Sequence, residues 1–265
     1  MLVRRILSGV LGIGFFYIMV SWGSLPFFLF TALLTLLGLN EYYEMLGEQY
    51  FSSKSLFLFL GLFFLAFCYF EIINKYAGIA VFILFVTIFI SHIYKNSFKN
   101  IVFTAGINLL GIIYISGGFM FMSFLRDFST DPFQATQALW LVLLGTWAVD
   151  TGAYFSGLFW GKKKLSPNIS PNKTVEGAIG GLIMCLLVVI LYSIIFNLFS
   201  IYIIILALFL GPAAVLGDLF ESALKRDLQV KDSGDIIPGH GGILDRFDSL
   251  LFSMPLSYYF LFIIL

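Results

Sequence analysis

The sequence predicts an all-α, polytopic integral membrane protein: a helical bundle of about nine transmembrane helices whose N-terminus lies in the cytoplasm. Of its 265 residues, 60% are hydrophobic and only 11% are charged, whereas soluble domains carry roughly 45–50% apolar and about 25% charged residues. So few charges cannot cover a water-facing surface, which excludes a soluble globular enzyme. The high hydrophobicity also excludes a disordered chain. The 32 Phe residues suit contact with lipid and packing within a helical bundle.

Nine runs of the sequence have the length and composition of membrane spans. A helix that crosses the bilayer needs roughly 20 mostly apolar residues. In chain order the runs are 6–23, 25–40, 55–73, 77–94, 101–124, 136–160, 175–196, 200–222 and 246–265. Arg4 and Arg5 before the first run resemble the start of a signal peptide, but that run is too long for one. We therefore expect it to stay as a helix.

The basic residues predict the orientation of the spans. With a cytoplasmic N-terminus, thirteen of the 15 Lys and Arg residues fall in cytoplasmic loops or span edges, and only Lys75 and Arg126 fall outside. This asymmetry agrees with the positive-inside rule, and a missed span would destroy it. We therefore expect a multi-pass protein of the cell (inner or plasma) membrane. The formal net charge is zero, so no basic excess points to nucleic acid, and we expect none among the partners.

Charged residues concentrate near the C-terminus. Residues 218–248 contain 11 charged side chains, more than a third of the chain's total. Asp218 lies at the inner end of the eighth span, and Glu221, Ser222 and Lys225 follow it on one helical face. Asp245 and Asp248 share a face where the last span begins. Two helix ends thus bring carboxylates toward the cytoplasmic side, and such oxygen ligands suit Mg²⁺.

The same segment supplies basic residues and glycines. Lys225, Arg226, Lys231 and Arg246 could contact phosphate oxygens, and His240 lies among glycines that allow close backbone approach to a ligand. A metal with basic residues beside a Gly-rich loop is typical of phosphoryl or nucleotidyl transfer. Two alternatives stay open: Asp245 could cap the last helix, and Asp218 could pair with a neighbouring Lys or Arg.

A second polar patch covers residues 146–177. Asp150 lies inside an apolar span and is followed by small residues that let helices or ligands approach closely. The next loop supplies Lys162, Lys163 and Lys164, which could instead attract anionic headgroups at about 1 kcal/mol per residue. Lys173 precedes a helix start, where backbone N–H groups could also hold phosphate. The early acidic segment, residues 41–48, is interpreted as an interfacial amphipathic stretch without chemistry.

The two patches together resemble the phosphatidate cytidylyltransferase family, also called CDP-diglyceride synthase. The elements D-T-G-A-Y, G-K and S-P-N-K-T-V-E-G in the second patch are family-like, although Leu158 stands where many members carry Arg. The C-terminal signature matches in residue type and spacing throughout. Its positions are Ser222, Lys225, Arg226, Lys231, Asp232, Pro238, His240, Gly241, Gly242, Asp245, Arg246 and Asp248.

The resemblance implies a reaction in which CTP and phosphatidate give CDP-diacylglycerol and pyrophosphate with Mg²⁺, and it leaves a second cation open. From the location of the polar patches we expect residues 101–265 to form the catalytic region, with a site facing the cytoplasm, and residues 1–100 to form an N-terminal region of four spans. The expected catalytic residues are Asp218, Lys225, Arg226, Asp245, Arg246 and Asp248, with Asp218, Asp245 and Asp248 as metal ligands. The expected substrate-binding residues are Asp150, Lys173, Ser222, Lys231, Asp232, His240, Gly241 and Gly242.

Two other functions compete with this one. A CTP-dependent kinase of a membrane lipid alcohol would use similar metal chemistry but would attack the γ-phosphorus. An ion-coupled transporter would place polar residues at the bilayer midplane, whereas here they gather at one face. The expected partners are CTP, phosphatidate and membrane lipids, and a homodimer is compatible with such a bundle.

Overall fold

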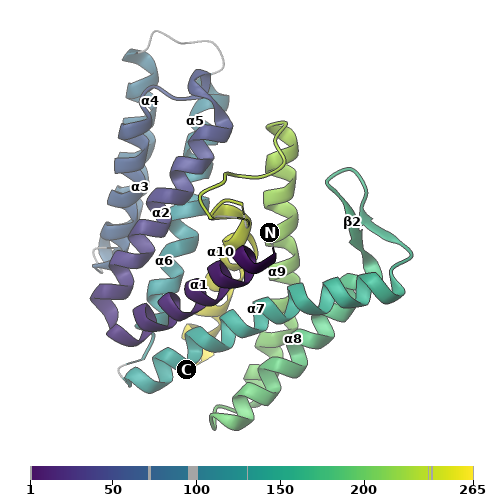
Figure 1. The fold of residues 1–265 in the computed structure, drawn as a ribbon. Helices are drawn as coiled ribbons and strands as arrows, with labels where there is room; N and C mark the ends of the chain where they lie inside the picture. The colour runs from purple at the N-terminus through teal and green to yellow at the C-terminus, as the bar shows by residue number, and fades with distance from the viewer. Residues whose placement is uncertain are drawn as a thin grey trace. The chain divides into compact units, whose positions relative to one another are not determined.

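The structure of the protein is a computed structural model, in which residues 2–70, 73–94, 101–129, 131–237, 239 and 241–264 are described. It is almost entirely helical (Figure 1). The elements are α1 (Leu2–Trp22), α2 (Ser24–Leu46), the 3₁₀ turn η1 (Glu48–Tyr50), α3 (Lys54–Tyr69), α4 (Ile73–Tyr94), α5 (Ile101–Gly111), the π-helical turn η2 (Ile112–Ser116), α6 (Gly117–Arg126), α7 (Pro132–Trp160), β1 (Lys164–Ser166), β2 (Ser170–Thr174), α8 (Val175–Ile195), α9 (Ile201–Asp227) and α10 (Leu244–Ile264).

The helices confirm a polytopic helical membrane protein. Because α5, η2 and α6 run on as one helical stretch, the described residues contain nine such stretches, one at each predicted span. Within the described ranges, six are long and apolar enough to cross a membrane. They are Ser24–Leu46, Ile101–Arg126, Phe133–Trp160, Val175–Ile195, Ile201–Asp227 and Leu244–Ile264. Shorter apolar helices occur at Gly12–Trp22, Lys54–Tyr69 and Val81–Ser91.

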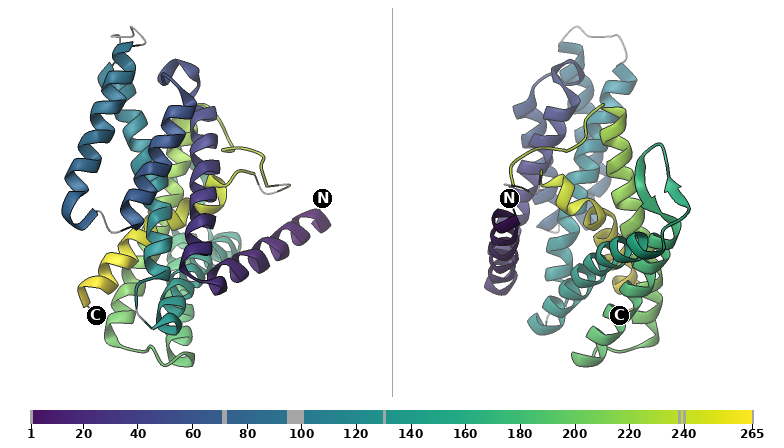
Figure 2. Two further views of the ribbon diagram at one scale, coloured as in Figure 1. Left: turned by 90° about the vertical axis from the view of Figure 1, so that its left-hand side faces the viewer. Right: turned by 45° about the vertical axis from the view of Figure 1, so that its right-hand side comes forward.

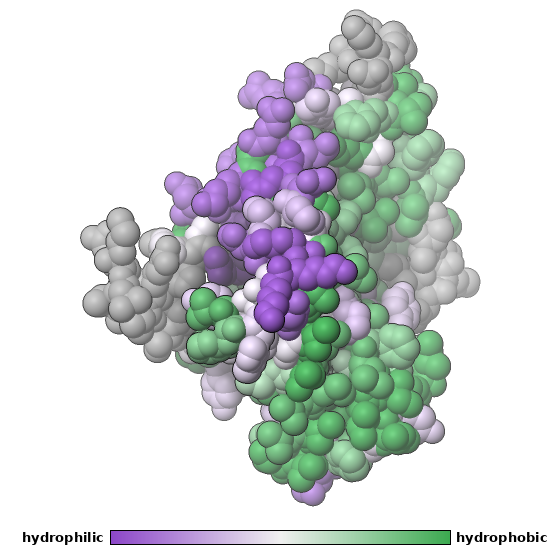
Figure 3. All heavy atoms as spheres, turned by 90° about the vertical axis from the view of Figure 1, so that its right-hand side faces the viewer, coloured by the Kyte–Doolittle hydropathy of each residue, from purple (hydrophilic) through white to green (hydrophobic). Residues whose placement is uncertain are grey.

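Large apolar side chains remain exposed on many helices, as expected where the bilayer is the solvent. On α8, Ile179, Ile183, Leu187, Leu191 and Ile194 are all exposed. Figure 3 shows hydrophobic residues over much of one face and hydrophilic residues gathered on another part of it. In water such a surface would favour aggregation, whereas lipid tails cover it without cost.

The chain forms two compact units that do not follow the order of the sequence. The first comprises Met1–Phe124 and Asp232–Asp245, and the second comprises Leu125–Lys231 and Arg246–Leu265. The expected N-terminal and catalytic regions, 1–100 and 101–265, followed the location of the polar motifs, which is a different criterion and stays a prediction. The Gly-rich segment 232–245 packs with the N-terminal helices although it lies far along the chain.

The core of the first unit is rich in aromatic side chains. Phe27, Tyr42, Tyr43 and Phe57 are almost fully buried. The Tyr42 hydroxyl donates to the carbonyl of Ile107 at 2.7 Å, and the Tyr42 ring occupies the space that a side chain at Gly111 would need. These contacts fix α2 against α5.

The second unit contains the one pair of β-strands among the described residues. Residues 162–174 had been expected to form a loop, but β1 and β2 pair there as an antiparallel hairpin, with Lys164 opposite Thr174 and Ser166 opposite Ser170. The hairpin extends from the adjoining ends of α7 and α8 (Figures 1 and 2). The Thr174 hydroxyl then caps α8 by accepting a hydrogen bond from the Gly177 N–H.

Candidate functional site

Most of the predicted site residues belong to the second unit. There the Lys173 ammonium, at the end of β2, pairs with the Asp218 carboxylate of α9 at 2.5 Å. Asp150 of α7 lies within electrostatic range of Asp218, Lys173 and Arg246. Asp248 of α10 lies within range of Asp218 and Asp150. Four separate elements therefore bring predicted acidic and basic residues to one place.

Glycines on α7 and α8 make this arrangement possible. A Cβ atom on Gly181 would lie 2.7 Å from the Val149 carbonyl oxygen, and one on Gly177 would lie 2.8 Å from the carbonyl oxygen of Ala153. Only glycine permits such close backbone contact. Val149 directly precedes Asp150, and Gly177 follows the hairpin that carries Lys173. The two close contacts between α7 and α8 therefore fix the position of Asp150 relative to Lys173.

Gly217 plays the same part between α9 and α10. A Cβ atom there would lie 2.6 Å from the Asp248 carbonyl oxygen and 3.1 Å from Cα of Ser249. The backbone of α10 therefore lies directly against the residue before Asp218. This contact explains how Asp218 and Asp248, from different helices, come close together.

We expect Gly181→Ala to destabilise the protein, because the added methyl group meets backbone that cannot move aside. Overpacking of this kind costs about 1–3 kcal/mol, and the melting temperature of the purified protein in detergent measures it. The matched control is Gly106→Ala in α5, where a Cβ atom would meet nothing within 4 Å. That variant should be neutral or slightly stabilised, because Ala favours helix over Gly by roughly 0.5–1 kcal/mol. Equal melting temperatures for the two variants would contradict the close-contact argument.

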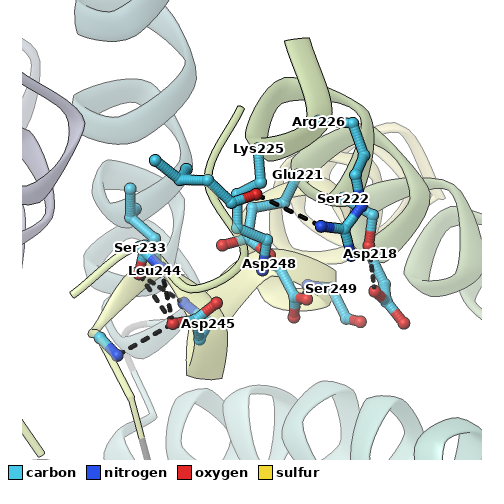
Figure 4. A network of polar contacts seen from close by, with 12 residues as sticks. Asp218, Glu221, Ser222, Lys225, Arg226, Ser233, Leu244, Asp245, Asp248 and Ser249 are labelled. Carbon is cyan, nitrogen blue, oxygen red and sulfur yellow. Dashed lines mark hydrogen bonds and ion pairs between the residues drawn. The ribbon is translucent and has the colours of Figure 1, made fainter. Parts of the chain in front are cut away.

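The face of α9 that follows Asp218 is polar and partly buried. The Ser222 hydroxyl donates to Asp218 at 3.4 Å, and Figure 4 shows the two side chains together. Glu221 is fully buried and pairs with Lys225 at 2.8 Å. The predicted common face of these residues is confirmed, but in this structure Lys225 has a carboxylate partner that the sequence analysis did not assign to it.

The end of α9 is tied to the hairpin by Arg226. Its Nε donates to the Ile169 carbonyl and its Nη1 to the Val230 carbonyl, each at 3.3 Å. Glu176 accepts from the backbone N–H groups of Lys162 and Lys163, at 3.0 and 3.1 Å. Glu176 stands in the first turn of α8, where a carboxylate interacts favourably with the helix dipole, and it also fixes the backbone of the exposed lysine run.

Asp245 lies in the first unit, at the start of α10. Its Oδ2 atom accepts from the Ser233 N–H at 2.9 Å, the Ser233 hydroxyl at 3.0 Å and the Gly242 N–H at 2.9 Å (Figure 4). Gly241, with φ +86°, makes the turn just before it. The alternative that Asp245 is the N-cap of α10 is wrong in its detail, because the helix begins at Leu244 and Asp245 binds backbone outside it.

The cap of α10 is Glu41, a residue for which the sequence predicted no such role. Glu41 of α2 is fully buried. It accepts from the N–H groups of Ile243 at 2.7 Å and Leu244 at 3.0 Å, and from the Ser233 hydroxyl at 3.1 Å. Glu41 was interpreted as part of an interfacial amphipathic stretch, but α2 continues through it to Leu46 and buries it. No local pattern signals a contact across 202 residues.

The remaining predicted residues are placed as follows. Lys231, Asp232 and Arg246 are exposed, and His240 and Pro238 lie outside the described residues. Within the described ranges, no three His, Cys, Asp or Glu side chains are spaced to hold a metal ion together. The metal set of Asp218, Asp245 and Asp248 therefore stays a prediction, with Asp245 in one unit and the other two in the second.

Comparison with known proteins gives a consistent result along the whole chain. The model of the cytidylyltransferase family matches residues 3–264. A phosphatidate cytidylyltransferase of Bacillus subtilis is 39% identical over 97% of each chain. One of Staphylococcus saprophyticus is 36% identical over 95% of this chain and 96% of its own. One of Thermotoga maritima is 40% identical over 56% of each chain. The match spans both units and includes every predicted site residue, so this chain belongs to the cytidylyltransferase family.

Proposed function

We propose that this protein is a phosphatidate cytidylyltransferase, which converts CTP and phosphatidate into CDP-diacylglycerol and pyrophosphate. The observation that carries the proposal is the identity of 39% over 97% of both chains with a relative of that name. The polar cluster around Asp218 on a membrane-embedded helical scaffold supports it. The acyl chains can stay in the bilayer while the lipid phosphate reaches this cluster.

The bond changes require little from the protein beyond binding and charge neutralisation. A phosphate oxygen of the lipid attacks the α-phosphorus of CTP, the bond from that phosphorus to the bridging oxygen breaks, and pyrophosphate leaves with the electron pair. A phosphomonoester has a second pKa of about 6, so the lipid phosphate is mostly a dianion at neutral pH. The attacking oxygen therefore has no proton to lose, and His240 is not needed as a general base.

The main obstacle is repulsion between two polyanions, and the basic residues address it. Lys173 and Arg246 lie within electrostatic range of the Asp150 carboxylate, so they can neutralise phosphate oxygens beside the acidic residues. Arg226 and Lys225 belong to the same stretch of α9, and we propose that they contact CTP or pyrophosphate. Pre-positioned positive charge of this kind stabilises the transition state of phosphoryl and nucleotidyl transfer.

The acidic residues of the second unit support a proposed Mg²⁺ site. Asp218 and Asp248 lie in each other's electrostatic field, with Asp150 and Glu221 also within range of Asp248, so acidic charge accumulates where a cation would relieve it. Mg²⁺ is usually bound by one or two carboxylates together with substrate phosphates and water. We propose that Asp218 and Asp248, both in the second unit, hold it. Asp245 as a third ligand stays a prediction of the sequence. When bound, the ion would neutralise the charge that develops on the phosphates.

We further propose that this site lies at the cytoplasmic face of the cell (inner or plasma) membrane, because CTP is dissolved in the cytoplasm. The support is the distribution of basic residues, because the predicted topology puts thirteen of the 15 on the side of the N-terminus. A homodimer remains a prediction of the sequence alone.

The proposal is tested by pyrophosphate release from CTP by the purified protein in detergent–lipid micelles. We expect release that depends on both phosphatidate and Mg²⁺, with no release when diacylglycerol replaces phosphatidate. Release of pyrophosphate at the same rate without any lipid would contradict the proposal, because the lipid phosphate would then not be the nucleophile.

A further inference from the structure

The N-terminal helices hold a buried carboxylate that no part of the proposed mechanism uses. Glu41 lies near the end of α2, and its side chain is fully buried. Its two oxygens accept hydrogen bonds from Ile243, Leu244 and Ser233, all of them in the segment 232–245. Burying a carboxylate is costly unless it is fully hydrogen-bonded, so the position of Glu41 requires that this segment stay in place.

These contacts satisfy the first backbone N–H groups of α10. The opening N–H groups of a helix have no partner within the helix and need acceptors from elsewhere. Here Glu41 accepts from Ile243 and Leu244, and the Ser233 hydroxyl accepts from the Asp245 N–H at 3.4 Å. A negative charge at this end also interacts favourably with the helix dipole. Glu41 therefore acts as a helix cap supplied from a distant part of the chain.

The fit of the segment around Glu41 is close. A Cβ atom on Gly234 would lie 3.0 Å from Glu41 Oε1, and one on Gly242 would lie 2.5 Å from Glu41 Oε2. Gly234 and Gly242 thus leave room for the carboxylate. Asp245 closes the network, because its Oδ2 accepts from Ser233 and Gly242.

We infer that Glu41 is a positioning residue for the proposed cytidylyl transfer: by capping α10 it fixes the start of the continuous helix that carries Arg246 and Asp248. The inference rests on the proposed function, which gives Asp248 its metal contact and Arg246 its phosphate contact. It assigns the N-terminal helices a part in the reaction without placing any of their side chains on a substrate.

The variant that tests this is Glu41→Gln. An amide keeps one acceptor oxygen but puts an NH₂ group against one of the two backbone N–H groups, so one hydrogen bond is replaced by two opposed donors. We expect kcat to fall at least tenfold and the Mg²⁺ concentration for half-maximal rate to rise at least fivefold. Glu41→Asp, which keeps the carboxylate but shortens it by one methylene group, should fold and show the same two changes to a smaller extent.

Two control variants separate positioning from general destabilisation. Glu44→Gln changes a carboxylate one turn along α2 that is 60% exposed and pairs with Lys54, and it should behave as the parent protein. Leu39→Ala removes a buried side chain that packs against Gly61 of α3. It should lower the melting temperature but leave kcat per folded molecule and the Mg²⁺ requirement within about twofold of the parent.

Hydrogen exchange of the metal-free protein gives a readout that does not depend on activity. In Glu41→Gln the amides of residues 242–245 should exchange at least tenfold faster, with α3 unchanged, whereas Leu39→Ala should accelerate exchange in α2 and α3. Parental kinetics in both Glu41 variants, or equal kinetic changes in Glu41→Gln and Leu39→Ala, would overturn the inference. An inactive parent protein would instead refute the proposed function, and the inference would fall with it even if the exchange pattern were as expected.

Discussion

Asp218→Asn and Asp248→Asn are each expected to lower turnover at least about a thousandfold, which corresponds to about 4 kcal/mol of transition-state stabilisation. Asn keeps the size of Asp but removes the negative charge that holds a divalent ion. Both side chains belong to the cluster in which Lys173 pairs with Asp218. The measurement is the initial rate at saturating CTP and phosphatidate across a range of Mg²⁺ concentrations.

The matched control for these variants is Asp227→Asn, which changes an exposed carboxylate at the end of α9. It should keep the parental rate. If Asp218→Asn kept more than a tenth of the parental rate at saturating Mg²⁺, Asp218 would serve only as the ion-pair partner of Lys173. The sequence left open this alternative, in which Asp218 pairs with a neighbouring Lys or Arg.

Lys225→Met is expected to lose both stability and activity. It would leave Glu221 buried without its cationic partner, and breaking a buried ion pair in this way costs about 3–5 kcal/mol. If Lys225 also contacts phosphate, as we propose, the loss of activity has a second cause. The double variant Glu221→Gln/Lys225→Met separates the two, because it removes the buried charge together with its partner.

We expect the double variant to recover most of the melting temperature but to stay at least a hundredfold below the parent in kcat/KM for CTP. Recovery of both quantities would show that Lys225 serves only to neutralise Glu221. Glu221→Gln alone provides the reference, since it keeps Lys225 and its positive charge.

The sequence was sufficient to predict the helices and the residues of the polar cluster. Nine apolar runs predict nine helical stretches, because lipid offers no hydrogen-bond partners and a helix satisfies its own backbone polar groups. The common face of Asp218, Ser222 and Lys225 follows from helical periodicity alone. The close approach of α7 and α8 follows from the small residues after Asp150, and the structure identifies Gly177 and Gly181 as their partners.

The contacts between distant segments could not be predicted in the same way. Residues 162–174 were predicted to form a loop, yet β2 contains Pro171 and Asn172, two residue types that are depleted in strands. The ion pair of Lys173 and Asp218 joins a hairpin to a helix. Helical periodicity predicts only which residues of one helix share a face, so it cannot predict such a pair. Glu41 was misread for the same reason: in the sequence it stands beside two other acidic residues, and only packing shows that it is the buried one.

The central claim is that the lipid phosphate attacks the α-phosphorus of CTP, and label transfer tests it most directly. The purified protein is given phosphatidate with CTP that carries ³²P at either the α- or the γ-phosphorus. The account predicts that the α-label moves into a lipid that yields CMP on hydrolysis, while the γ-label leaves entirely as pyrophosphate. Transfer of the γ-label to the lipid would identify a CTP-dependent kinase and contradict the account, as would the absence of any label in lipid when Mg²⁺ is present.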